Sequence, residues 1–220
     1  MQKYTKKTMR QSSIIFNANP KKTRMHNGFK VIMDYDNESD KKQYAPAIID
    51  LSHMSKWDVQ DMHLNQIKPL GQNIPGKPGE CSIQNKKNII FRLNHTQACI
   101  WHILPEESPQ MSEIIPAEPP YTDITDAHAL LAIVGPSVPS FIEKITNLDL
   151  MSPHRNTPFV MQGPILHIAS RILVLQLEKE NSVVLFSFSR GYGQIMAEAL
   201  LDSGSRQGVY FAGEQLFWST

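Results

Sequence analysis

Apolar residues follow a regular pattern mainly in the second half of the chain. Residues 129–134 form a continuous apolar run that ends at a Gly-Pro pair. The apolar residues that follow recur at helical spacing: Val138, Phe141, Ile142 and Ile145. This pattern predicts a strand, a tight turn and an amphipathic helix.

Two more strands and a second helix are expected further along. The apolar runs over 165–177 and 183–188 predict strands joined by the polar turn 178–182. A last set of apolar residues at helical spacing predicts a helix that ends at Ser203 and Gly204. Its members are Ile195, Met196, Ala199 and Leu200.

The first half of the chain has a weaker pattern. Residues 47–59 are strand-like, and the segment 69–79 that follows is rich in Gly and Pro. Residues 89–93 and 98–104 predict two strands of a hairpin that turns at 94–96. The order of elements does not alternate strand with helix, which favours an α+β fold over a doubly wound parallel sheet.

These patterns divide the chain into four parts. Residues 105–120 hold five prolines and cannot continue a helix or a central strand, so they are interpreted as a linker. The other parts are a basic, weakly ordered N-terminal arm over 1–45, a first lobe over 46–104 and a similar second lobe over 121–220.

Charge is distributed unevenly. The formal net charge is +1, yet residues 1–30 contain eight Lys or Arg and no Asp or Glu. The arm has no ladder of stacking aromatic residues and no recognisable nucleic-acid-binding module. These features argue against nucleic acid as a partner, and favour a solvated arm or one that docks on an acidic protein.

Several classes of protein are excluded by composition. The sequence contains no run of eighteen apolar residues, so no membrane span is predicted. The basic start is not followed by the apolar core of a secretory signal. A cytoplasmic location is therefore expected. Cys81 and Cys99 lack a second Cys or His pair at metal-ligand spacing. We therefore expect reduced thiols, no disulfide and no metal site.

Three segments resemble a known family. Residues 48–59 contain Asp-Leu-Ser-His-Met, and residues 123–136 join an acidic segment to an apolar run and a Gly-Pro turn. Residues 191–209 contain a leucine pair that is followed by Gly204 and Gly208. They are similar to the opening signature, the second-lobe entry and the late helix of the glycine-cleavage T-protein family. The resemblance covers residues 47–220 and implies two T-protein-type, folate-binding lobes. It does not extend to that family's C-terminal barrel.

A two-lobe chain of this length most resembles the gamma subunit of heterotetrameric sarcosine oxidase. The resemblance implies partners: a flavin-bearing alpha subunit, and beta and delta subunits. The resemblance also implies that those partners hold the flavins, NAD and zinc, and this chain has none of the matching motifs, neither GxGxxG nor a paired CxxC. Tetrahydrofolate is the one cofactor that the family implies for a T-protein-type lobe.

The family's catalytic carboxylates have no match here. The place where the family has an acidic pair after a strand entry reads Asn88-Ile89-Ile90-Phe91-Arg92, and residues 176–181 lack its Tyr-Thr-Gly-Glu turn. No catalytic residue is therefore predicted. Only Met54 transfers, as a residue that lines the folate pocket, with core packing as the alternative.

Two other polar segments were considered as sites. His53 lies beside Asp50 and Ser52, but alternation along a strand places it on the opposite face from both, which argues against a catalytic triad. Residues 189–193 lack the remaining residues of a dinucleotide or P-loop fingerprint, which leaves Arg190 as a candidate anion contact.

The function that these observations favour is that of a non-catalytic, gamma-like subunit of a complex that demethylates N-methyl amines. The alternatives are a free-standing aminomethyltransferase and a folate-dependent assembly or tRNA-modification factor. A subunit should expose aromatic residues for its partner. The candidates, for which core packing is the alternative, are Trp57, Tyr210, Phe211, Phe217 and Trp218.

Overall fold

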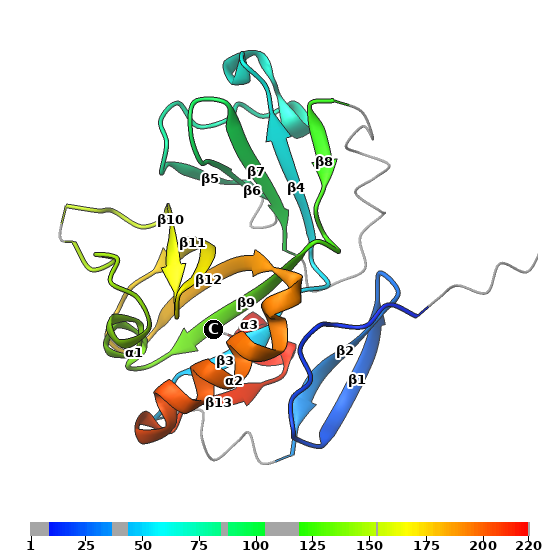
Figure 1. The fold of residues 1–220 in the computed structure, drawn as a ribbon, viewed down its shortest axis with the longest axis vertical. Helices are drawn as coiled ribbons and strands as arrows, with labels where there is room; N and C mark the ends of the chain where they lie inside the picture. The colour runs from blue at the N-terminus through cyan, green and yellow to red at the C-terminus, as the bar shows by residue number, and fades with distance from the viewer. Residues whose placement is uncertain (1–8, 37–43, 85–87, 104–118, 153, 220) are drawn as a thin grey trace, which may run out of the picture.

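The computed structural model describes residues 9–36, 44–84, 88–103, 119–152 and 154–219. They form two β-sheets, a separate β-hairpin and a few helices (Figure 1). This mixed composition agrees with the α+β class expected from the sequence.

The larger sheet has six strands. Its order is β10 (Phe159–Ile165), β11 (Ile168–Gln176), β12 (Ser182–Ser189), β9 (His128–Gly135), β3 (Ala47–Asp50) and β13 (Tyr210–Ala212). Neighbouring strands are antiparallel, except that β13 runs parallel to β3.

The two faces of this sheet are covered differently. Helices α1 (Val138–Ile145) and α2 (Gly193–Gly204) pack on one face, where Leu131 and Ile133 meet Phe141 of α1. Leu130 and the other alternate residues of β9 point to the opposite face, which packs against the second sheet. Burial on both faces explains why β9 is an uninterrupted apolar run.

The second sheet has five antiparallel strands. Its order is β5 (Cys81–Gln84), β6 (Asn88–Arg92), β7 (Gln97–His102), β4 (Ser55–Gln60) and β8 (Tyr121–Asp123). Phe91 and Trp101 pack edge to face on its inner side, with ring centroids 4.8 Å apart, and face the six-stranded sheet. Its outer side holds a smaller apolar cluster around Trp57 and Ile100, which the short 3-10 helices η1 (Leu64–Gln66) and η2 (Pro69–Gly71) help to cover.

The sheets do not follow the lobe boundaries expected from the sequence. β3 belongs to the predicted first lobe but pairs with β9 and β13 of the second. β8 belongs to the predicted second lobe but pairs with β4 of the first. Each half of the chain thus gives one strand to the other sheet. The predicted linker lies outside the described residues apart from Pro119 and Pro120.

A hairpin of β1 (Pro20–His26) and β2 (Phe29–Tyr35) replaces the weakly ordered arm that the sequence favoured over this stretch. Its turn, Asn27-Gly28, has positive φ at both positions, 49° and 80°, as a tight two-residue hairpin turn requires. Alternate residues of β2 are buried, and the basic residues of β1 lie mainly on the exposed side. The basic residues of 20–35 therefore obscured an alternation of apolar and polar residues that is typical of a β-strand.

The hairpin docks against the C-terminal end of the chain. Helix α3 (Glu214–Ser219) contacts β2, and Gly213 approaches the backbone of Met33 so closely that a Cβ atom at Gly213 would lie 2.3 Å from the Met33 carbonyl. Only glycine fits there. Two more of the described 3-10 helices, η4 (Arg190–Tyr192) and η5 (Ser205–Gln207), flank α2.

Candidate functional site

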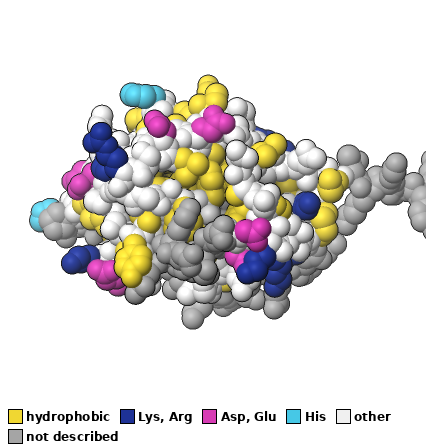
Figure 2. Space-filling view, turned by 90° about the horizontal axis from the view of Figure 1, so that it is seen from below, with side chains coloured by type: hydrophobic (Ala, Val, Ile, Leu, Met, Phe, Trp, Pro, Cys, Tyr) yellow, Lys and Arg dark blue, Asp and Glu magenta, His cyan; other side chains and the backbone are white. Residues whose placement is uncertain are grey.

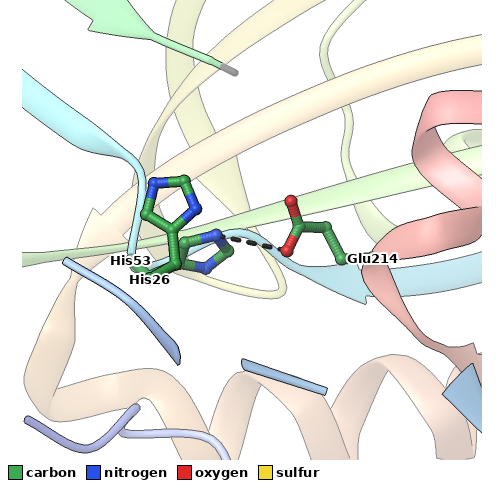
Figure 3. A group of neighbouring side chains, drawn as sticks. All are labelled: His26, His53 and Glu214. Carbon is green, nitrogen blue, oxygen red and sulfur yellow. Dashed lines mark ion pairs between the residues drawn. The ribbon is translucent and has the colours of Figure 1, made fainter. Parts of the chain in front are cut away.

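Three buried ionisable side chains meet where the hairpin docks. His26 ends β1, His53 lies in the turn between β3 and β4, and Glu214 begins α3 (Figure 3). Their exposed fractions are 3%, 4% and 1%, and one ligand-type atom of each lies within 4.8 Å of the others. We call His26, His53, Glu214 and the neighbouring Arg24 the latch cluster.

Glu214 is the centre of this cluster. Its Oε1 accepts hydrogen bonds from Arg24 Nη2 at 2.6 Å and from Trp218 Nε1 at 2.8 Å. Its Oε2 lies 3.4 Å from His53 Nε2. Burial alone would raise the pKa of Glu214, but contacts with His53, Trp218 and Arg24 outweigh it and hold that pKa below its ordinary value. Glu214 is therefore an ionised carboxylate at neutral pH.

His26 is held as a neutral ring. Arg24 Nη2 lies 3.3 Å from His26 Nδ1, and because a guanidinium only donates, Nδ1 carries a lone pair and the ring proton lies on Nε2. The rings of His26 and His53 meet edge to face, with centroids 4.8 Å apart. Burial, His53 and Arg24 together lower the pKa of His26 to about 4.

Two imidazoles and a carboxylate are a donor set that zinc or iron could use. Arg24 makes this cluster a poor fit for a metal ion. Its positive charge would oppose a cation, and it occupies the Nδ1 lone pair of His26 while the other ring nitrogen keeps its proton. The arrangement fits a buried ionic contact better, with one guanidinium balancing one carboxylate.

A small cavity adjoins His53. Its volume is about 60 Å³, and it lies between β2, the segment 12–16, the end of β3 and Ala212. The polar residues on its wall include Ser12 and Asp50, and Ser12 Oγ donates to Asp50 Oδ2 at 2.5 Å. Pockets that hold drug-sized ligands measure about 300–1,000 Å³, so this cavity suits a few water molecules rather than a pterin.

The structure does not bring Asp50, Ser52 and His53 into a triad. Asp50 Oδ1 accepts the Ser52 backbone N–H at 2.9 Å, and Ser52 Oγ accepts the Leu130 backbone N–H at 3.1 Å. His53 instead faces Glu214. The partner of His53 was thus missed, because 161 positions separate the two residues.

Met54, the one residue that the resemblance implies for a folate pocket, is 1% exposed and lies in the apolar cluster between the sheets. Its carbonyl and that of Ser52 accept hydrogen bonds from Lys56 Nζ at 2.7 and 2.8 Å. Lys56 is fully buried, and burial lowers its pKa to about 7. This lysine shapes the turn that carries His53.

Two arginines considered from the sequence have local partners. Arg92 donates to Asn65 Oδ1 and to backbone carbonyls that include those of Asn94 and His95, so it ties loops to the end of β6. Arg190 lies 3.3 Å from Asp126 and also donates to the Gln11 carbonyl. Neither guanidinium is held open for an anion.

The aromatic residues considered for an interface differ in burial. Trp57 and Tyr210 are 3% and 5% exposed and pack in the apolar clusters. Phe211, Phe217 and Trp218 are half-buried, and Phe211 stacks on Phe16. A space-filling view shows apolar side chains scattered between charged ones on one face (Figure 2). Core packing is therefore the correct alternative for Trp57 and Tyr210, and a subunit interface through Phe211, Phe217 and Trp218 stays a prediction.

Comparison with known proteins identifies the fold. No protein-family model and no curated protein matches the sequence. A chain of heterotetrameric sarcosine oxidase from Corynebacterium sp. U-96, in complex with pyrrole 2-carboxylate, has a TM-score of 0.59 at 14% identity, over 75% of this chain and 86% of that one. Glycine cleavage system aminomethyltransferase T from Bartonella henselae has a TM-score of 0.57 at 16% identity, over 87% of this chain.

These similarities define a T-protein-type fold. The chain spans about half of the aminomethyltransferase, 55% of its length. No helix among the described residues is long and apolar enough to cross a bilayer.

Proposed function

We propose that this chain is a non-catalytic, gamma-like subunit of a sarcosine oxidase-type complex that demethylates N-methyl amines. The T-protein-type fold supports a role in folate-linked one-carbon chemistry. The more specific proposal, that the subunit is non-catalytic, rests on the contacts that Arg92 makes.

Arg92 stands where the resemblance implies a catalytic carboxylate. It is 5% exposed, and it donates to the side chain of Asn65 and to four backbone carbonyls, of Pro75, Gly76, Asn94 and His95. A cation held in this way cannot accept a proton or orient a pterin as a carboxylate does. Arg92 instead holds the surrounding loops together, which supports a structural role for the chain.

The extent of the structural match also supports the subunit assignment. The match covers 75% of this chain and 86% of the sarcosine oxidase chain. The aminomethyltransferase is almost twice as long as the part that this chain matches. The proposed partners are a flavin-bearing alpha subunit and beta and delta subunits, which would hold the flavins, NAD and zinc.

Tetrahydrofolate is the ligand that the fold suggests. Met54 lies within the core, and the cavity beside His53, at about 60 Å³, is too small for a pterin. On the contacts of Arg92 we propose that the chain contributes to assembly and does not carry one-carbon chemistry by itself.

The purified chain tests this proposal. It should be colourless, bind tetrahydrofolate no more tightly than about millimolar in calorimetry, and show no demethylation of sarcosine or other N-methyl amines. Turnover by the isolated chain, with folate bound at micromolar concentration, would favour the second candidate, a free-standing aminomethyltransferase.

A further inference from the structure

The latch cluster joins segments that are far apart in the sequence. Arg24 and His26 belong to β1, His53 follows β3 and Glu214 begins α3. The cluster therefore fastens the hairpin to both the six-stranded sheet and the C-terminal helix. Figure 3 shows the ion pair between His53 and Glu214 at its centre.

Apolar packing under the hairpin is limited. Phe29, Val31 and Met33 form a small cluster of their own, separate from the two large clusters that hold the sheets. The cavity of about 60 Å³ lies between β2 and the body of the protein. The buried ionic contacts of the latch cluster therefore act beside this limited apolar packing, and breaking one of them would leave a buried charge without its counterion.

We propose that the latch cluster is an acid-sensitive fastening that releases the β1–β2 hairpin from the body when His26 takes up a proton. A protonated His26 would place a second positive charge beside the guanidinium of Arg24 in a buried site. Release relieves this repulsion because both side chains then reach water.

The charged and titratable groups around His26 act in a consistent direction. Arg24 and His53 oppose its protonation, and His102 of β7 adds a smaller effect of the same sign. The negative charge of Glu214 raises the pKa of His26, but by less than burial lowers it. The pKa of Glu214 is itself lowered in the cluster, so a released Glu214 also takes up a proton more readily than a docked one. Both groups therefore bind more protons when the hairpin is free.

The size of the effect follows from linkage. His26 has a pKa of about 4 in the docked hairpin and an ordinary value of 6.5 when released. Between these values the equilibrium constant for release rises by up to about tenfold per pH unit, and by about 300-fold over the whole range. The dependence is already half its maximum at pH 6.5 and disappears above about pH 7.5.

Amide hydrogen exchange of the whole chain tests the proposal. Protection factors, corrected for the intrinsic rate at each pH, are measured between pH 7.5 and 4.5. The amides of residues 20–35 should lose protection by up to about tenfold per pH unit below pH 6.5. The amides of β9, β11 and β12 should lose less. Parallel loss in the hairpin and the sheet, or no loss in either, would overturn the proposal.

Two variants identify the responsible histidine. His26→Gln keeps a group that can accept from Arg24 but cannot be protonated, so hairpin protection should no longer vary between pH 6.5 and about 5.5, above the range in which a released Glu214 takes up its proton. His95→Gln, at an exposed position, should retain the wild-type pH dependence. A His26→Gln chain with unchanged pH dependence contradicts the proposal.

A direct titration keeps the test valid if His26→Gln cannot dock its hairpin at any pH. The ¹³Cε1 resonance of His26 in the unsubstituted chain should titrate with a midpoint below about 5. A midpoint near 6.5 while residues 20–35 remain protected would refute the latch. Neither outcome depends on the proposed subunit function, which is tested separately by assays of binding and turnover.

Discussion

Arg171 Nη2 lies 3.3 Å from Asp58 Oδ1, and this ion pair joins β11 of the six-stranded sheet to β4 of the five-stranded sheet. The two side chains are 17% and 8% exposed. The thiol of Cys99 lies between them, within 3.1 Å of Arg171 Nη1 and 3.2 Å of Asp58 Oδ1. Burial raises the pKa of Cys99, so the thiol stays protonated and donates to Asp58.

Replacing Asp58 with Asn should destabilise the protein by about 3 kcal/mol, because Arg171 would remain as a buried charge without its counterion. Urea unfolding followed by circular dichroism measures this change. Asp202→Asn, at an exposed position of α2, is the matched control and should change stability by less than about 0.5 kcal/mol. Equal effects of the two substitutions would show that the ion pair does not hold the sheets together.

Gly213→Ala should loosen the docked hairpin. The added Cβ would lie 2.3 Å from the carbonyl of Met33 and 2.4 Å from the backbone nitrogen of Asp34, so the backbone must shift. A loss of about 1–3 kcal/mol is expected in thermal unfolding, as for other overpacked sites. Gly191→Ala is the control, since nothing lies within 4 Å of its Cβ position. A variant at position 213 as stable as the control would mean that the hairpin does not approach Gly213 as described.

Lys56 makes stability depend on pH. Burial lowers its pKa to about 7 from 10.5, so the unfolded chain binds more protons than the folded one between these values. Stability should therefore rise as pH increases from 7 to about 8.5, by at most about 1.4 kcal/mol per pH unit. Lys56→Met should remove this rise. An identical pH profile for variant and wild type, compared by urea unfolding, would contradict a neutral Lys56.

Local patterns in the sequence predicted several elements correctly. The run 129–134 with its Gly-Pro ending became β9 and the turn before α1, and the expected hairpin of residues 89–104 is the pair β6 and β7. In these cases the apolar spacing, the turn residues and the final burial agree. Strand β10 was missed because Gly163 and Pro164 interrupt its pattern.

Long-range features could not be predicted in the same way. The pairing of β3 with β13 and the meeting of His26, His53 and Glu214 depend on contacts between distant parts of the chain, and no local spacing marks them. The β1–β2 hairpin was predictable in principle from Asn27-Gly28 and the alternation after it. The many Lys and Arg residues of 1–30 obscure those signals, although charged residues on the exposed face of a strand do not oppose folding.

Co-purification tests the subunit assignment most directly. The full chain should be co-expressed with the flavin-bearing large subunit of an N-methyl amine oxidase from the same organism, with an affinity tag on the large subunit alone. If the chain is a gamma-like subunit, it should be recovered in a fixed stoichiometric ratio and stay bound during gel filtration. A chain that elutes by itself, while the large subunit assembles and oxidises its substrate without it, would contradict this account.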